Sequence, residues 1–251
     1  MDSFTKKTYM TSRSLTYAYY DSAPSKPLAA HKPTLLFLHG FPDNAHVWKD
    51  VVLHMRTLPH RIILPDLLGF GGTSKPTDPS VFKSNAMAAD LAELLASEGA
   101  SKIIVIGHDA GSFMAQRMWL WQPQLIVGVA LLNVAYMPLF IEPFDLAAAN
   151  AHFESATGYP RYTYWELFTA DDGAKYEVEK TLSPERAPIT VPTFFLGCSG
   201  DEVCLPEMIE ESKEAGLVPN VTVKVIDCAH WCMMEKPDEV AQALHEFLSD
   251  M

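Results

Sequence analysis

The stretch that decides the fold is Ile103-Ile-Val-Ile-Gly-His-Asp-Ala-Gly111, in which an apolar run of strand length leads into a glycine-flanked turn. Gly107 and Gly111 indicate a turn too tight for a Cβ atom at either position, and a helix is expected from Ser112. Such a turn forces its middle residue, Asp109, into a strained conformation that exposes the side chain, as a nucleophile at a strand-to-helix junction requires. The alternative is that Asp109 only caps the following helix, because Asp is a preferred N-cap residue.

An aspartate at the centre of this turn indicates a particular chemistry. A carboxylate can displace a leaving group from an sp³ carbon and form an alkyl ester, but it is poorly suited to direct attack on an ester or amide carbonyl. Asp109 therefore favours a covalent alkyl-enzyme intermediate over the reaction of an ordinary esterase.

The sequence on both sides of this turn predicts an α/β fold. Further apolar runs of strand length lie at residues 34–39, 61–64, 127–132, 193–196 and 221–226. Helical patterns lie between them, at residues 45–55, 85–98, 112–121, 206–215 and 237–248. Because most of the runs are continuously apolar, we expect a twisted, mostly parallel sheet flanked by helices on both faces. Residues 7–20 alternate between polar and aromatic and predict an antiparallel hairpin that opens the sheet.

Residues 134–190 interrupt the alternation of strands and helices. They contain no convincing strand, are rich in aromatic residues and are expected to form short helices and turns. An insertion at the carboxyl ends of parallel strands lies over the crevice where such sheets bind ligands. We therefore expect a core formed by residues 1–133 and 191–251, and a small helical cap formed by residues 134–190.

Two further polar residues follow late strands. Asp201 comes after the run at 193–196, and His230 comes after the run at 221–226. The order nucleophile, acid, histidine is that of a catalytic triad on a parallel α/β sheet. We therefore expect Asp109, Asp201 and His230 to meet at one edge of the sheet.

Two backbone amides are expected to face the same site. His39-Gly-Phe-Pro42 follows the first apolar run, where this kind of fold places one oxyanion-hole amide. The N–H groups of Phe41 and Ala110 would then stabilise the oxyanion that forms when water attacks an ester on Asp109. Asp66, in a glycine-rich loop, is expected to bind the backbone of that loop instead of serving as the catalytic acid.

Together these motifs resemble the α/β-hydrolases that use an aspartate nucleophile, above all the soluble epoxide hydrolases. The matching stretches are His39-Gly-Phe-Pro42, Pro65-Asp-Leu-Leu-Gly-Phe-Gly-Gly-Thr-Ser-Lys-Pro76, Gly107-His-Asp-Ala-Gly111, Gly200-Asp201 and Ala229-His230-Trp231. The resemblance implies that Asp109 is the nucleophile, Asp201 the charge-relay acid and His230 the base that activates water. It also implies that Tyr164, in the cap, donates a proton to the epoxide oxygen, although Tyr164 could equally be a core aromatic.

The candidate substrate-binding residues are His39, Phe41, Pro42, His108, Tyr162, Trp165 and Trp231, of which His108 is also expected to pack under the turn.

The sequence departs from the family pattern in two places. Ala110 follows the nucleophile where epoxide hydrolases and haloalkane dehalogenases usually have Trp, and Ala110 and Met114 do not supply the arginines of fluoroacetate dehalogenases. The cap is only 57 residues long, and the part that would carry a second proton-donating tyrosine is missing. Epoxide hydrolysis to a diol is therefore the leading hypothesis. The alternatives are a haloalkane or haloacid dehalogenase, a lactone or ester hydrolase, an epoxide-opening cyclase of secondary metabolism and, last, a non-catalytic binding protein.

Composition limits the partners. The 251 residues include 19 Lys and Arg against 31 Asp and Glu, for a net charge of −12, so no nucleic-acid partner is expected. There is no apolar run of the about 18 residues that a membrane span requires, and residues 1–14 lack the apolar core of a secretory signal. We expect a cytoplasmic enzyme that takes a small apolar epoxide-type substrate, as a monomer or a homodimer.

No cofactor or metal is predicted. The four cysteines, Cys198, Cys204, Cys228 and Cys232, form no Cys-x-x-Cys pair and are expected to be reduced thiols in the core. Cys228-Ala-His230-Trp-Cys232 leaves a metal site as the less favoured alternative.

Overall fold

The computed structural model describes residues 1, 3–22, 32–137, 145–158, 160, 162, 188–249 and 251. Two units make up the chain: one consists of Met1–Met137 and Pro188–Met251, and the other of Pro138–Ala187. Within the described residues, no helix has the length and apolar character needed to cross a bilayer.

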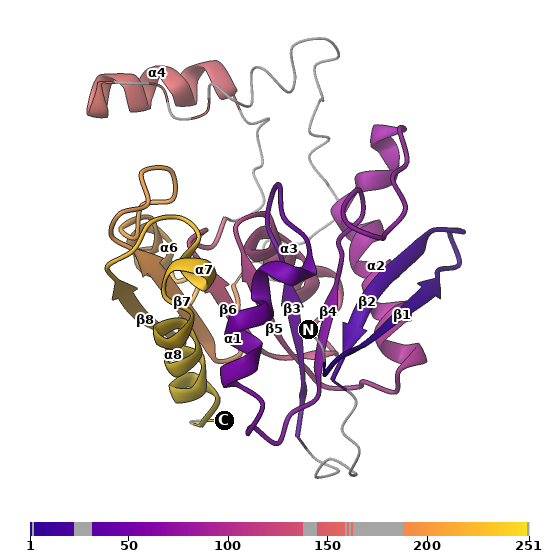
Figure 1. Cartoon of the computed structure of the whole chain (residues 1–251). Helices are drawn as coiled ribbons and strands as arrows, with labels where there is room; N and C mark the ends of the chain where they lie inside the picture. The colour runs from indigo at the N-terminus through magenta and orange to yellow at the C-terminus, as the bar shows by residue number, and fades with distance from the viewer. Residues whose placement is uncertain are drawn as a thin grey trace. The chain divides into compact units, whose positions relative to one another are not determined.

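An eight-stranded sheet forms the centre of the first unit (Figure 1). The strands are β1 (Thr5–Met10), β2 (Thr16–Asp21), β3 (Thr34–Leu38), β4 (Ile62–Pro65), β5 (Ile103–His108), β6 (Ile126–Leu132), β7 (Thr193–Cys198) and β8 (Val221–Ile226). They lie in the order β1-β2-β4-β3-β5-β6-β7-β8. β1 pairs antiparallel with β2 and β2 antiparallel with β4, whereas all other neighbours are parallel. The predicted α/β-hydrolase fold, with its mostly parallel sheet and opening hairpin, is confirmed.

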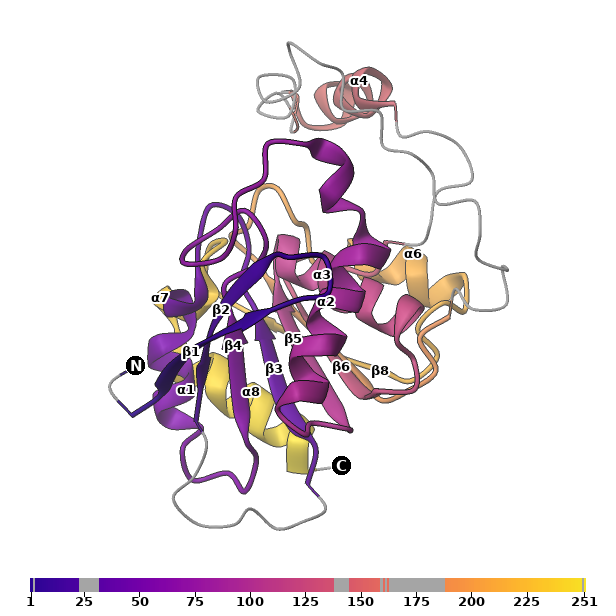
Figure 2. The same ribbon diagram turned by 90° about the vertical axis from the view of Figure 1, so that its right-hand side faces the viewer.

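Helices cover both faces of the sheet (Figure 2). They are α1 (Lys49–His54), α2 (Ser84–Ser97), α3 (Ala110–Trp121), α6 (Met208–Glu214), α7 (Cys232–Glu235) and α8 (Pro237–Ser249), with 3₁₀ turns η1 (Ala45–Trp48) and η2 (Pro79–Phe82). Residues of α1, α7 and α8 share one core cluster, and residues of α2, α3 and α6 share the other. β3 contributes to both, because Leu35 and Phe37 face the first cluster while Leu36 and Leu38 face the second.

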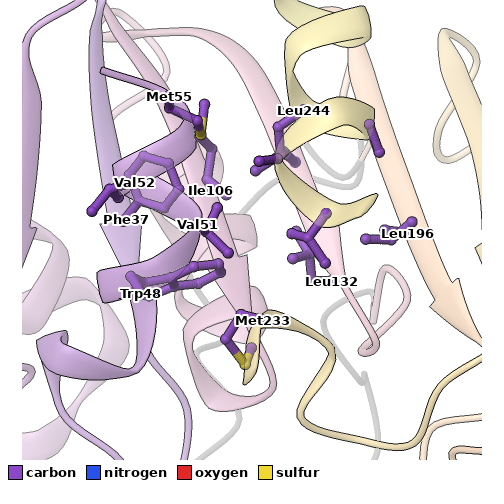
Figure 3. Close-up of a cluster of buried hydrophobic side chains, with 14 of the residues drawn as sticks. Phe37, Trp48, Val51, Val52, Met55, Ile106, Leu132, Leu196, Met233 and Leu244 are labelled. Atoms are coloured by element: carbon purple, nitrogen blue, oxygen red, sulfur yellow. The ribbon is translucent and has the colours of Figure 1, made fainter. Parts of the chain in front are cut away.

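The first cluster shows how the sheet is held to its helices (Figure 3). Phe37 and Ile106 from two central strands meet Val51 of α1 and Leu244 of α8, and each is fully buried. The Trp48 ring packs edge-on against Phe37, with ring centroids 5.1 Å apart. Burial of this kind contributes about 1.5–3 kcal/mol for each large apolar side chain, so the strands that carry the site are fixed by both layers.

Three predicted helices differ from the structure by two or more residues at an end, among them the helix predicted at residues 206–215, which is α6 (Met208–Glu214). The helix predicted at residues 45–55 consists of η1 followed by α1, because the Asn44 side chain accepts the His46 N–H and tightens the first turn. The helix after the glycine-flanked turn begins at Ala110 instead of Ser112, since the Asp109 carbonyl already accepts the Phe113 N–H at 3.1 Å.

The second unit contains α4 (Leu146–Thr157). The Asp145 side chain caps its start by accepting the Ala148 N–H, and Gly158 ends it in the left-handed conformation with φ of 88°. The Tyr162 N–H donates to the Asn150 side chain at 2.7 Å, and the Tyr162 ring lies 5.4 Å from that of Phe153.

Candidate active site

Asp109 occupies the tight turn between β5 and α3 with φ of 53° and ψ of −120°, a strained backbone for a residue with a side chain. A Cβ atom on Gly107 would lie 2.1 Å from the Gly111 carbonyl oxygen, and one on Gly111 would lie 2.2 Å from that of Leu38. Both positions therefore require glycine. The Asp109 side chain makes no capping hydrogen bond to α3, so helix capping does not explain the aspartate.

The structure brings the predicted acid and base next to Asp109. His230 Nδ1 donates to Asp201 Oδ2 at 2.7 Å, and His230 Nε2 lies 3.6 Å from Asp109 Oδ2. The Asp201 side chain is only 1% exposed, compared with 18% for His230 and 22% for Asp109. The buried acid thus orients the ring, and the ring and the aspartate in the turn both reach solvent.

Sheet order explains why these three residues meet. Each residue comes just after a strand: Asp109 directly follows β5, and Asp201 and His230 lie in the loops after β7 and β8. These three strands are parallel, and together with β6 they are neighbours in the sheet. Side chains at the carboxyl ends of neighbouring parallel strands gather at one edge, where sheets of this kind bind ligands.

The loop after β3 reaches the same carboxylate. The Phe41 N–H donates to Asp109 Oδ1 at 2.9 Å, and the Phe41 side chain is 45% exposed beside the exposed Pro42. A Cβ atom on Gly40 would lie 2.6 Å from Asp109 Cβ, so this loop can approach the turn only because residue 40 is glycine. The amides of Phe41 and Ala110 both stabilise negative charge on Asp109.

Hydrogen bonds keep both carboxylates charged. Burial alone would raise the pKa of each, but the His230 ring and backbone amides lower the pKa of Asp109 and bring that of Asp201 to about 2. Burial alone would lower the pKa of His230, but the hydrogen bond to Asp201 and the nearby Asp109 carboxylate outweigh it and raise the pKa well above its ordinary value. The three groups therefore stabilise one another as a carboxylate, a carboxylate and an imidazolium.

His39 and His108 were predicted to bind substrate, but both are fully buried. His39 Nε2 accepts the Leu67 N–H at 2.8 Å, which leaves Nδ1 to donate to the Gly40 carbonyl at 2.9 Å. His108 Nε2 donates to the backbone carbonyl of His230 at 2.8 Å, and burial followed by the nearby His230 charge lowers the pKa of His108 to about 4. Because neither ring is exposed, the structure does not support a substrate contact by His39 or His108. Both neutral imidazoles hold the backbone of a loop instead.

Trp231 and Asp66 tie further loops together. Trp231 Nε1 donates to Asp43 Oδ2 at 3.0 Å, and its ring stands edge-on to that of His230 with centroids 5.1 Å apart. Trp231 is 39% exposed and so remains available to a substrate. The Asp66 carboxylate accepts the N–H groups of Ala45 and Gly72, which confirms that it binds loop backbone.

Two residues of this site, Asn133 and Cys204, were not predicted from the sequence. Asn133 Nδ2 donates to Asp201 Oδ2 at 2.7 Å. Its position immediately after β6, between the strands that lead to Asp109 and Asp201, was a usable signal. Cys204 lies in the loop that follows Asp201, and no pattern pointed to its thiol.

One group among the described residues has the spacing to hold a metal ion: ligand atoms of Asp201, Cys204 and His230 lie within 4.8 Å of one another. The Asp201 oxygens do not fit that role, because they already accept from two backbone amides and from the side chains of Asn133 and His230. The alternative metal site built on Cys228 and Cys232 does not form. Cys228 Sγ instead contacts Cys198 Sγ at 3.3 Å, and all four cysteines are free and buried.

The predicted cap residues Tyr164 and Trp165 lie outside the described residues. Tyr162 is described, and it belongs to the second unit with α4.

Comparison with known proteins identifies similar chains. Residues 35–243 match the model of the alpha/beta hydrolase family. A fluoroacetate dehalogenase from Burkholderia sp is 30% identical over 191 residues, which are 72% of this chain and 57% of that protein. Epoxide hydrolase 1 from Siraitia grosvenorii is 29% identical over 188 residues, 73% of this chain and 59% of that protein. The chain thus spans somewhat more than half the length of these two relatives.

Solved structures are similar over the whole fold. The crystal structure of an epoxide hydrolase from Vigna radiata superposes with a TM-score of 0.75 at 19% identity, covering 100% of this chain and 99% of that one. Epoxide hydrolase A from Mycobacterium thermoresistibile gives a TM-score of 0.70 at 20% identity, with 98% of each chain covered. At these identities the likeness concerns the fold alone.

Proposed function

The chain belongs to the alpha/beta hydrolase family, and from this membership we propose that it is a hydrolase that opens epoxides through an alkyl ester on Asp109. One observation carries the proposal: Asp109 accepts the Phe41 N–H on one carboxylate oxygen, while its other oxygen lies 3.6 Å from His230 Nε2. The epoxide hydrolases among the relatives, including one from Siraitia grosvenorii, support the same reaction.

In the first step, a carboxylate oxygen of Asp109 attacks a ring carbon of the epoxide. The new C–O bond forms as the carbon–oxygen bond of the ring breaks, and the released oxygen takes up a proton. By the resemblance to epoxide hydrolases, Tyr164 supplies this proton. The product of the step is a neutral hydroxyalkyl ester on Asp109.

Formation of the ester changes the base. The interaction with Asp109, 3.6 Å away, is the largest of the contributions that raise the pKa of His230, and it depends on a charged carboxylate. Once Asp109 is esterified, the pKa of His230 falls and the ring can release its proton to solvent. Neutral His230, still held by Asp201 at Nδ1, then accepts a proton from water at Nε2.

In the second step, the activated water attacks the ester carbonyl carbon. The Phe41 N–H, which already contacts Asp109 Oδ1 at 2.9 Å, and the Ala110 N–H would stabilise the oxyanion. Collapse of this intermediate breaks the bond between the acyl carbon and the alkyl oxygen, and the leaving alkoxide takes the proton that the attacking water kept. The diol is released, the carboxylate returns with one oxygen from water, and the Tyr164 phenolate regains a proton from solvent. The expected substrate is a small apolar epoxide, which the exposed rings of Phe41 and Trp231 favour.

Dehalogenation is the second candidate, because the fluoroacetate dehalogenase is 30% identical over 191 residues. It would use the same attack by Asp109, with a halide as the leaving group. Ala110 and the buried Met114 supply neither a halide donor nor an arginine that could hold a haloacid carboxylate. This absence favours the epoxide.

A substrate panel distinguishes the two candidates. We expect diol formation from terminal and styrene-type epoxides, no fluoride release from fluoroacetate and no halide release from haloalkanes. Asp109→Ala should abolish turnover, whereas Asp227→Ala, at an exposed position in the loop before His230, should retain it. Halide release without diol formation would make the protein a dehalogenase, and diol formation by Asp109→Ala would refute the role of Asp109.

A further inference from the structure

Asn133 is a buried residue that directly follows β6, at the edge of the sheet where the candidate active site lies. It is 1% exposed, and its backbone has a φ of 66°. Its N–H donates to the Leu196 carbonyl of β7 at 2.9 Å, which fixes its backbone against the strand that leads to Asp201.

The Asn133 side chain is joined to the catalytic acid. Asn133 Nδ2 donates to Asp201 Oδ2 at 2.7 Å, and the same oxygen accepts His230 Nδ1–H at 2.7 Å. Asn133 Oδ1 faces the Cys232 thiol, which donates to it at 3.5 Å and so defines which end of the amide points to Asp201. The other oxygen, Asp201 Oδ1, accepts two backbone amides, those of Val203 and Cys204.

Two physical reasons could account for an asparagine here. The left-handed backbone favours Asn, Asp or Gly over other residues. That reason alone needs no amide group, and glycine would satisfy it better. The 2.7 Å contact with a buried carboxylate needs the amide and no particular backbone. The two reasons therefore predict different outcomes when Asn133 is replaced by glycine.

We infer that Asn133 is a positioning residue of the proposed reaction. Its amide fixes the Asp201 carboxylate, and through it the ring of His230, for the hydrolysis of the ester on Asp109. Without this donor, Asp201 Oδ2 keeps His230 as its only side-chain partner among the described residues. The carboxylate can then tilt about the two backbone hydrogen bonds at Oδ1, and the His230 ring tilts with it. The inference rests on the proposed function for its kinetic consequence but not for its geometry.

The kinetic test compares Asn133→Gly with Asn133→Ala. Alanine lacks the amide and is strained at a φ of 66°, whereas glycine lacks the amide without strain, so Asn133→Gly should have the higher melting temperature. Both should lose kcat about 10- to 100-fold, as expected when one hydrogen bond to a charged group is removed. The ester on Asp109 should accumulate in both, because its formation does not use Asp201. Wild-type kcat in Asn133→Gly would overturn the inference.

A second measurement needs no substrate. The His230 Nδ1 proton, shared with Asp201, should give a low-field proton NMR signal, and this signal should broaden or move in Asn133→Gly. Asn220→Gly, at an exposed asparagine, is the matched control and should leave it unchanged. If the wild-type protein opens no epoxide but the signal changes as expected, the proposed function fails and the positioning role stands. An unchanged signal in Asn133→Gly refutes the positioning role, whatever the substrate.

Discussion

Asp109→Asn replaces the charged carboxylate beside His230 with a neutral amide of nearly the same size, as ester formation does during the proposed reaction. The substitution therefore tests whether the charge on the nucleophile sets the protonation of the base. Asp109 and Asp201 together raise the pKa of His230. Removing the charge of Asp109 should therefore lower this pKa, while Asp201 still holds the ring.

The distance gives the expected magnitude. Two unit charges 3.6 Å apart attract by about 1 kcal/mol in a water-like dielectric and by about 5 kcal/mol at an effective dielectric constant of 20. Asp109 and His230 are 22% and 18% exposed, which places the pair between these limits. At about 1.4 kcal/mol for each tenfold change in proton affinity, the pKa of His230 should fall by about one to three on replacement of Asp109 by Asn.

The assay is an NMR titration of the His230 ring in the wild-type, Asp109→Asn and Asp227→Asn proteins. Asp227 lies three residues before His230 and is exposed, so its replacement should leave the pKa nearly unchanged. Equal His230 pKa values in the wild-type and Asp109→Asn proteins would refute the idea that esterification of Asp109 releases the base.

Three other predictions concern the same region. The fold lowers the pKa of Asp201 to about 2, so its charge contributes about 2–3 kcal/mol to stability above pH about 4, and this contribution is lost as pH falls toward 2. The unfolding free energies of the wild-type and Asp201→Asn proteins should therefore converge over that interval. A constant difference between them would contradict this prediction. Gly107→Ala should destabilise the protein by more than about 3 kcal/mol in urea unfolding, because three backbone atoms lie within 2.6 Å of the new Cβ. Gly99→Ala is the control: no atom lies within 4 Å of its Cβ, and it should lose only about 1–2 kcal/mol through its positive φ. Equal losses would refute the explanation by steric clash. Trp231→Phe removes the hydrogen bond to Asp43 but keeps a ring beside His230, so kcat should fall a few-fold and stability should change by less than about 1 kcal/mol. Asp43→Asn keeps an acceptor for the Trp231 N–H and should preserve kcat.

The meeting of Asp109, Asp201 and His230 could be predicted from the sequence because each follows a separate apolar run and parallel strands end at one edge. The glycines around Asp109 were equally informative, since the spacing Gly-x-Asp-x-Gly corresponds to two positions where backbone atoms lie within 2.2 Å of any added Cβ. Such features depend on local chain geometry, which the sequence reports directly.

Features that depend on long-range contacts could not be predicted in the same way. His39 and His108 are predicted from their positions to bind substrate, but their rings form hydrogen bonds to loop backbone in the core, because sequence position does not report burial. The Cys232 thiol meets Asn133, 99 positions away, a pairing that depends on how α7 and β6 pack. The amide of Asn133 is meaningful only once its partner, Asp201, is placed beside it.

The central claim, an alkyl ester on Asp109, is tested most directly by mass spectrometry of His230→Gln protein mixed with an epoxide that the wild-type protein converts to a diol. Glutamine cannot activate water, so the first step should proceed and the second should stop. The account predicts that the peptide containing Asp109 gains the full mass of one epoxide, and that Asp109→Asn/His230→Gln protein shows no such gain. An unmodified Asp109 peptide in His230→Gln protein, with diol formation in the wild type, would contradict the account.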